Sequence, residues 1–135
     1  MAESGGGFLM EPARFPGRAP IDAYGNGGFR FAGMSHRGSI MALPSGIEAW
    51  PVASVSDIAP DSLSRLIAEA DAIEILLVGT GNEMKLLPAD VRNVLEQAGI
   101  YPDLMATGAA VRTFNVLLSE ERAVAAALIA VDSTR

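Results

Sequence analysis

The chain has 135 residues, 50% of them hydrophobic, and this length suits a single domain with a buried core. It contains no cysteine, which excludes disulfides, thiolate metal ligands and cysteine nucleophiles. The formal net charge of -6 disfavours binding to the phosphate backbone of nucleic acids, and no basic cluster indicates contact with an anionic membrane surface.

The sequence shows no targeting or membrane-spanning segment. Its first residues lack the basic start and apolar run of a signal peptide. The longest apolar run, residues 123–131, is too short to cross a bilayer. We therefore expect a cytoplasmic protein without membrane insertion, and the absence of cysteine agrees with a reducing compartment.

The predicted organisation is a tail, one domain and a second short tail. Residues 1–19 are rich in Gly and Pro and predict a disordered N-terminal tail, in which Phe8, Leu9 and Met10 either stay flexible or dock on the body or on a partner. Residues 20–131 form the predicted α/β domain. Residues 132–135 form the C-terminal tail.

The first half of the domain is predicted to be rich in β-strands. Short apolar or alternating segments are separated by turn residues, and Pro44-Ser45-Gly46 predicts a hairpin turn. The predicted strands are residues 21–24, 29–31, 39–43 and 47–52.

The second half alternates between helices and strands. Pro60 opens a helix, Pro88 opens a second helix with Gly99 as its C-terminal cap residue, and Thr107 begins a third. Residues 73–78 predict a buried strand, and residues 100–105 predict another whose start is near an edge because of Pro102.

The segment 123–131 is compatible with two structures. Its alanines favour a helix, whereas its wholly apolar character after a polar turn favours a central strand. We choose the strand. The resulting order predicts an α/β fold in which helices pack on a central mixed sheet next to a β-rich N-terminal portion.

Four patches of the chain resemble one known family. They are IDAYG at residues 21–25 with Gly27 and Phe29, LLVGTG at 76–81, MATGAAVRTFNVL at 105–117 and RAVAAALI at 122–129. The chain resembles the family of small proteins that includes mitochondrial complex I assembly factor 3. The resemblance implies a three-layer fold, a strand at 123–131, and a non-enzymatic, bacterial, cytosolic member without a cofactor.

The loop Gly79-Thr80-Gly81-Asn82 is the first candidate site. It follows a predicted central strand, where clefts of open α/β sheets form, and its glycines allow a ligand to approach backbone amides. The dinucleotide fingerprint is incomplete because Met84 replaces the third glycine, and no P-loop Lys is present. A tight structural turn is the alternative.

Thr107 and Arg112 form the second candidate, together with Lys85. Thr107 is expected to cap the third helix, and Arg112, about one turn later, adds the N–H donors of its guanidinium. Together with Lys85, these residues could hold a small anion at the positive end of the helix. The alternatives are a plain cap for Thr107 and a salt bridge between Arg112 and Glu83 or Asp103.

Other residues offer no catalytic set. His36, the only histidine, lies in residues 34–38, a loop or strand entry, and does not complete a serine triad or a zinc site. We interpret the Asp and Glu side chains as solvated surface charges. Trp50 either packs in the core, the preferred interpretation, or joins an exposed apolar patch with residues 8–10.

The resemblance implies that the protein binds protein partners and helps assemble a multi-subunit complex such as respiratory complex I. The alternative hypothesis is a protein or enzyme that binds a small anionic ligand through the glycine loop and Arg112.

Overall fold

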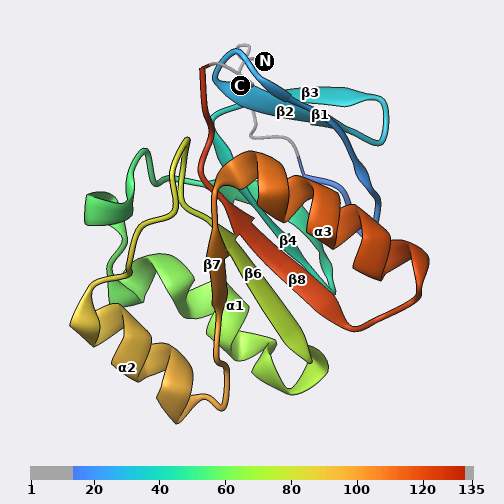
Figure 1. Ribbon diagram of the computed structural model, residues 1–135. Helices are drawn as coiled ribbons and strands as arrows, with labels where there is room; N and C mark the ends of the chain where they lie inside the picture. The colour runs from blue at the N-terminus through green and yellow to red at the C-terminus, as the bar shows by residue number, and fades with distance from the viewer. Residues whose placement is uncertain (1–13, 133–135) are drawn as a thin grey trace, which may run out of the picture.

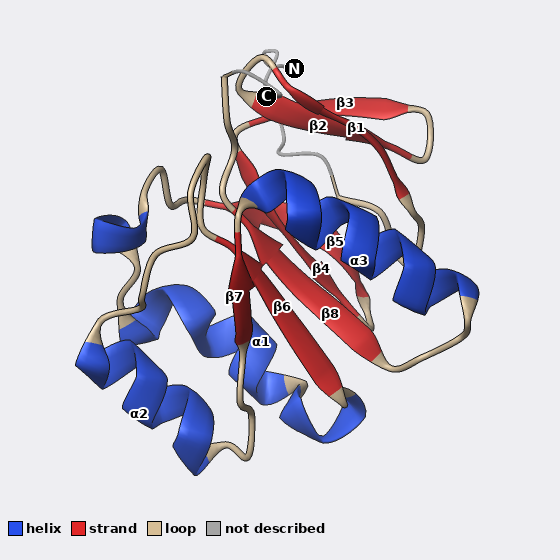
Figure 2. Ribbon diagram, in the orientation of Figure 1, coloured by secondary structure: helices blue, strands red, loops and turns tan. Residues whose placement is uncertain are grey.

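The computed structural model describes residues 14–132, which form two β-sheets and three α-helices (Figures 1 and 2). The strands are β1 (Ile21–Gly25), β2 (Gly28–Phe31), β3 (Met34–Arg37), β4 (Ser39–Leu43), β5 (Gly46–Trp50), β6 (Ile75–Gly79), β7 (Asp103–Met105) and β8 (Val124–Leu128). The α-helices are α1 (Ser64–Ala68), α2 (Ala89–Gln97) and α3 (Thr107–Ser119), and short 3-10 helices cover Val55–Asp57, Pro60–Leu63 and Ala70–Ala72.

The larger sheet has the strand order β5-β4-β8-β6-β7. β8 lies at its centre, parallel to β6 and antiparallel to β4. The segments 73–78 and 123–131 therefore run side by side through the middle of the molecule, and 123–131 is a strand, as predicted. β8 ends before the predicted limit because the N–H of Ala130 donates to the Ser39 hydroxyl instead of a neighbouring strand.

Two crossovers place helices on both faces of this sheet. The chain passes from β6 through α2 to β7, and then back through α3 to β8 on the other side of β6. Because crossovers between parallel strands are right-handed, connections that run in opposite directions carry their helices to opposite faces. Figure 2 shows α3 across one face, with α1 and α2 away from it.

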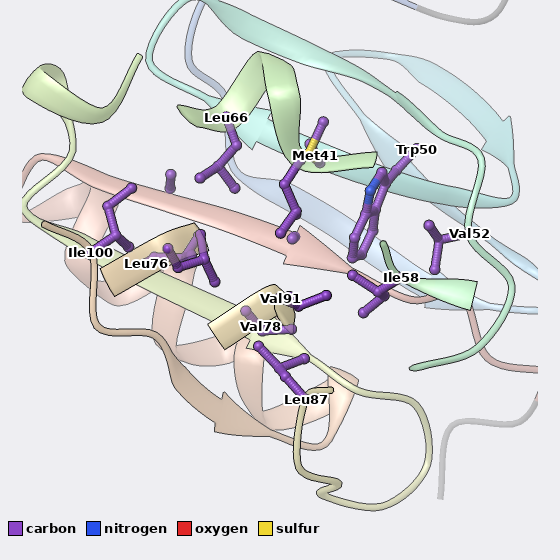
Figure 3. Close-up of a cluster of buried hydrophobic side chains, with 14 of the residues drawn as sticks. Met41, Trp50, Val52, Ile58, Leu66, Leu76, Val78, Leu87, Val91 and Ile100 are labelled. Atoms are coloured by element: carbon purple, nitrogen blue, oxygen red, sulfur yellow. The ribbon is translucent and has the colours of Figure 1, made fainter. Parts of the chain in front are cut away.

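Alternating side chains of the central strand enter two separate cores. Ala125, Ala127 and Ile129 face a cluster that contains Leu66 of α1 and Val91 and Leu95 of α2 (Figure 3 shows this side of the sheet). Val124, Ala126 and Leu128 face the other cluster, with Ala110, Val111 and Phe114 of α3. The sheet is thus covered on both faces, which confirms the expected three-layer α/β fold.

The smaller sheet is the antiparallel meander β1-β2-β3. Phe29 and Phe31 of β2 point into the core on the α3 side. β3 is a full strand, whereas the sequence indicated only a loop or a strand entry there. The reason is a two-residue hairpin turn, in which Ala32 and Gly33 have φ angles of 52° and 76°. A positive φ is uncommon for alanine, so the sequence pattern did not indicate this turn.

The helices differ from the predicted ones mainly at their starts. The chain after Pro60 begins as a 3-10 helix, and only Ser64–Ala68 is α-helical. Pro88, predicted in the first turn of α2, is its N-cap residue, and α2 begins at Ala89. Gly99 follows the C-cap residue Ala98, as predicted. β7 begins only after Pro102, which has no N–H to donate to a neighbouring strand. Within residues 14–132, no helix combines the length and the apolar composition that a membrane crossing requires.

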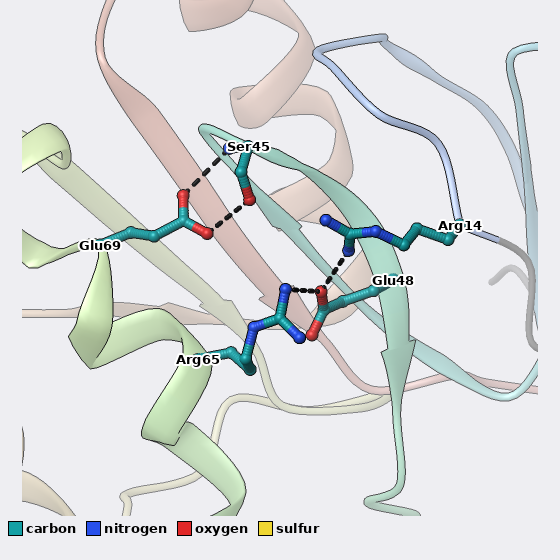
Figure 4. A network of polar contacts seen from close by, with 5 residues as sticks. All are labelled: Arg14, Ser45, Glu48, Arg65 and Glu69. Atoms are coloured by element: carbon teal, nitrogen blue, oxygen red, sulfur yellow. Dashed lines mark hydrogen bonds and ion pairs between the residues drawn. The ribbon is translucent and has the colours of Figure 1, made fainter.

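A polar network ties the first described residues to the domain (Figure 4). Glu48 of β5 accepts from Arg14 at 2.6 Å and forms an ion pair with Arg65 of α1 at 3.1 Å. The backbone of Phe15 also pairs with Ile47 of β5. Residues 14–19, which the sequence analysis assigns to a tail, are therefore attached to the domain, while residues 8–10 lie outside the described part of the chain.

Candidate functional site

A cavity of about 340 Å³ lies at the carboxyl ends of β6 and β8. Its wall is built from three segments that meet at this edge of the sheet: the loop after β6, the chain after β8, and the turn that precedes the first 3-10 helix. The lining residues are Ala53, Ser54, Val55, Thr80, Gly81, Asn82, Glu83, Lys85, Ile129, Ala130, Val131 and Asp132. The glycine loop therefore borders a cavity at the position where clefts form in open α/β sheets.

Thr80 holds the loop that follows β6 in one shape. Its hydroxyl donates to the Glu83 carbonyl at 2.6 Å and accepts from the Lys85 N–H at 3.0 Å. Thr80 is buried, and both bonds are partly shielded from water. These contacts close a tight turn, and the hydroxyl is engaged within the loop itself.

Thr107 has a different role from the expected helix cap. The N-cap residue of α3 is Ala106, and Thr107 lies within the first turn with no exposed surface. Its hydroxyl donates to the Ile129 carbonyl at 2.7 Å and accepts from the Gly81 N–H at 3.0 Å. The predicted cap is therefore wrong, because the side chain joins the start of α3 to the ends of two strands instead.

Gly79 allows this close contact between α3 and the sheet. A Cβ atom at position 79 would lie 2.9 Å from the Thr107 Cα and 3.0 Å from its Oγ1. Real Cβ atoms essentially never approach as closely as the first distance, and the second is tighter than nine in ten real Cβ contacts, so a larger residue would push α3 away from β6. Gly79 and Thr107 thus form a packing contact beneath the cavity and are not among the residues that line it.

Arg112 is also absent from the lining of the cavity. Its side chain is exposed on α3, on the surface away from the buried residues Val111 and Phe114. Within residues 14–132 it forms no ion pair, so the alternative pairing with Glu83 or Asp103 is not seen either. Of the predicted site residues, the structure brings Thr80, Gly81, Asn82 and Lys85 together, while Gly79, Thr107 and Arg112 lie outside the cavity wall.

The charges around the cavity are mixed. Lys85 is accompanied by Glu83 and Asp132, so acidic groups outnumber basic ones in the lining. This field does not select anions. Among the described residues, no group of three His, Cys, Asp or Glu side chains could hold a metal ion.

Asp132 and the residues near it were missed by the sequence analysis. A second cavity of about 550 Å³ adjoins the first and shares Ala53, Ala130 and Asp132 with it. The two cavities meet because the chain after β8 runs between them, where Asn26 donates to the carbonyl of Asp132. No local pattern in the sequence indicates this long-range contact.

Met84 and Leu86 were missed as well. They are 56% and 75% exposed, respectively, on the loop between β6 and α2, while the next residue, Leu87, is buried in the core. The loop is therefore anchored at both ends, by Thr80 and by Leu87, and presents two large apolar side chains to solvent. Trp50, in contrast, is only 2% exposed, which confirms its predicted place in the core.

His36 lies on β3, half-buried and opposite Phe29 of β2. Burial lowers the pKa of its imidazole below the usual 6.5, and this effect outweighs a backbone hydrogen bond to Ser39, which favours the charged form. The folded state therefore disfavours protonation of His36 more than the unfolded state does.

This shift predicts a specific acid sensitivity. Because the folded pKa lies below the unfolded one, the contribution of His36 to stability is present above about pH 6.5 and is lost as the pH falls towards the folded pKa. We expect the free energy of unfolding, measured by urea denaturation, to fall less between about pH 7 and pH 5 in His36→Gln than in the wild type. Equal decreases in the two proteins would contradict this prediction.

Comparison with known proteins places the chain in a family. Residues 21–129 match the family described as "Protein of unknown function (DUF498/DUF598)". An uncharacterized protein of Rhodobacter capsulatus is 39% identical over 115 residues, which cover 85% of this chain and 87% of the relative. The assembly factor 3 of the NADH dehydrogenase [ubiquinone] 1 alpha subcomplex is 37% identical in mouse and 38% in human, over 87% and 81% of this chain. The matched regions span 63% and 59% of those two longer proteins.

Solved structures agree with this assignment. A crystal structure of a Bartonella henselae protein, described as an outer membrane protein, is 58% identical with a TM-score of 0.83 over 87% of this chain and 99% of that one. A Rhodopseudomonas palustris protein is 46% identical with a TM-score of 0.76 over 91% of both chains. A Mth938-like domain of Bordetella pertussis is 29% identical with a TM-score of 0.72 over 85% of this chain and 88% of that one. The chain belongs to the DUF498/DUF598 family, and its homology to complex I assembly factor 3 confirms the resemblance seen in its sequence.

Proposed function

We propose that this protein is a non-enzymatic, cytoplasmic assembly factor that binds a protein partner and assists the formation of a multi-subunit respiratory complex. The observation that carries the proposal is the alignment of 81–87% of the chain with relatives named as complex I assembly factors. Because the chain spans less than two thirds of those relatives, the proposal concerns the part that they share, which is the folded domain.

The geometry of the cavity favours contact over chemistry. The hydroxyls of Thr80 and Thr107 already bind backbone groups, and the charges in the lining are mixed. Arg112, on which the anionic-ligand hypothesis depends, is exposed on α3 and does not line the cavity. Two hydroxyls that are engaged within the fold and a lining of mixed charge are not typical of a catalytic or anion-binding site.

The loop between β6 and α2 is the contact surface in this proposal. Met84 and Leu86 are apolar and exposed, and the hydrogen bonds of Thr80 and the burial of Leu87 hold their backbone in place. Exposed apolar residues on a pre-organised loop suit protein recognition, because little conformational entropy is lost when a partner covers them.

The test is complementation in the native host. Deletion of the gene is expected to reduce the amount of assembled complex I seen on native gels, and the wild-type protein to restore it. A Met84→Ser/Leu86→Ser double variant should fold normally but restore little assembly. Tyr101→Ser, which changes a side chain that is 73% exposed on another loop, should restore assembly fully and serves as the matched control.

Two outcomes would overturn the proposal. If deletion leaves the amount of assembled complex I unchanged, the assembly role is wrong. If the double variant complements as well as the wild type, the loop is not the contact surface.

A further inference from the structure

A basic hollow lies on the outward face of the three-stranded sheet. Arg30 of β2 is opposite Ser35 of β3, and Gly28 is opposite Arg37, so these four residues share one face. Phe29 and Phe31 point to the other face, into the core. The hollow measures about 370 Å³ and is lined by Gly25, Asn26, Gly28, Phe29, Arg30, Ser35, His36 and Arg37.

The hollow stands out from the rest of the chain by its charge. None of its lining residues is acidic, although the chain as a whole has a net charge of -6. Small residues, Gly28 and Ser35, lie between the two guanidinium groups. No large side chain separates the two arginines, so both guanidinium groups can reach a ligand that lies over Gly28 and Ser35.

Arg30 and Arg37 have no carboxylate partner among residues 14–132. Three of the six other arginines of this region form ion pairs within the fold. Arg14 and Arg65 share Glu48, and Arg122 pairs with Glu74. The Asp132 carboxylate lies beside Arg37, since both side chains approach Gly27, but no ion pair joins them. Two exposed guanidinium groups that line one hollow without acidic lining residues suit the binding of carboxylates.

The edge of the same sheet is open along β3. In a two-residue hairpin, the residues on either side of the turn, here Phe31 and Met34, form a hydrogen-bonded pair between the two strands. At the other end of β3, the N–H of Gly38 donates to the Gly27 carbonyl, which fits the same alternation of bonded pairs. Residues that alternate with these pairs direct their backbone groups away from β2. Ser35 and Arg37 therefore present N–H and C=O groups to the outside, and no described residue pairs with them.

We infer that this edge and the adjacent hollow bind an acidic, extended segment of a partner protein as an added strand. The segment would pair with the free backbone groups of Ser35 and Arg37. Strands lie about 4.8 Å apart, so carboxylates on its outward face would reach Arg37 directly and Arg30 across the small Ser35. This inference gives the chemistry of the partner in the proposed function, and it rests on that function only in requiring a protein partner.

The experiment uses the purified full chain and a labelled peptide of about eight residues that alternates Glu and Thr. Fluorescence anisotropy should show binding that weakens as the salt concentration rises. A peptide with Gln in place of Glu should bind with an affinity that is lower by roughly tenfold or more. Arg30→Gln/Arg37→Gln should lose binding to a similar extent, while Arg92→Gln, at an exposed position on α2, should bind like the wild type.

Amide hydrogen exchange tests the added strand. The peptide should slow exchange at the amides of Ser35 and Arg37 and leave the amide of His36, already bonded to β2, unchanged. A peptide that binds without protecting these two amides would overturn the strand addition. Equal binding of the Glu and Gln peptides, or of a single-stranded DNA of similar length, would overturn the acidic protein segment as the occupant.

A second copy of this chain could also occupy the edge. A dimer in sedimentation analysis, with the amides of Ser35 and Arg37 protected in the absence of peptide, would overturn the inference. These results are independent of the complementation assay. If the peptide does not bind but the protein restores assembly, this surface is not the binding site and the proposed function stands. If deletion of the gene leaves assembly unchanged, the proposed function is wrong, and the peptide experiment alone decides the inference.

Discussion

Replacement of Trp50 by alanine is expected to lower the free energy of unfolding by about 3–5 kcal/mol. The side chain is 2% exposed at the end of β5 and packs in the core between the sheet and α1 and α2. Its removal leaves a large cavity and also removes the hydrogen bond from the indole N–H to the Ser62 carbonyl. Urea denaturation followed by circular dichroism measures the effect, since the variant has lost the only tryptophan.

Two further variants control this prediction. Trp50→Phe keeps an aromatic ring and should lose less than the alanine variant. Tyr101→Ala changes an exposed residue, 73% accessible, and should change stability by about 0.5 kcal/mol or less. A loss below about 1 kcal/mol in Trp50→Ala would contradict the packing of this core.

Replacement of Thr107 by valine is expected to destabilise the protein by about 2–4 kcal/mol, although the two side chains have nearly the same shape. The hydroxyl is the partner of two backbone groups, the N–H of Gly81 and the carbonyl of Ile129. Valine leaves the buried Ile129 carbonyl and the partly buried Gly81 N–H without this partner, and each unsatisfied buried group costs about 1–3 kcal/mol. Thermal and urea unfolding of the variant measure the loss.

Thr107→Ser retains the hydroxyl and should lose less stability than Thr107→Val. Thr113→Val tests the same chemical change at a half-exposed position on α3, and it should be close to neutral. If the serine variant is the less stable of the two at position 107, the methyl group and not the hydroxyl carries the effect, and the bridge between α3 and the sheet has no energetic role.

The arrangement of the large sheet was predictable because its central strands are apolar over their whole length. Residues 125–127 are alanines, whose local preference is helical, yet all three are fully buried in β8. Burial on both faces outweighs that preference, and a continuous apolar run after a polar turn indicates such a strand. The hairpin of β2 and β3 was not predictable in the same way, because its turn uses Ala32 at a positive φ.

The candidate site was predictable in position but not in its contacts. The glycine loop was expected at the carboxyl end of a central strand, and it borders a cavity there. The direction of Thr107 could have been read from its spacing with Val111 and Phe114, which places all three on one face of a helix. Arg112, next to Val111, then points elsewhere.

The exposed residues of the loop between β6 and α2 carry no such signal. Met84, Leu86 and Leu87 have similar hydrophobicity, but only Leu87 is buried. Their segment has no regular secondary structure, so periodicity cannot separate inward from outward side chains. The exposed apolar pair becomes visible only when the loop is placed against the sheet.

Photo-crosslinking in the native host tests the central claim most directly. A photoreactive amino acid at position 86 should crosslink to a subunit or assembly protein of complex I, identified by mass spectrometry. The same group at position 101, equally exposed on another loop, should not yield that product. Crosslinks to complex I proteins from position 101 but none from position 86 would contradict the account.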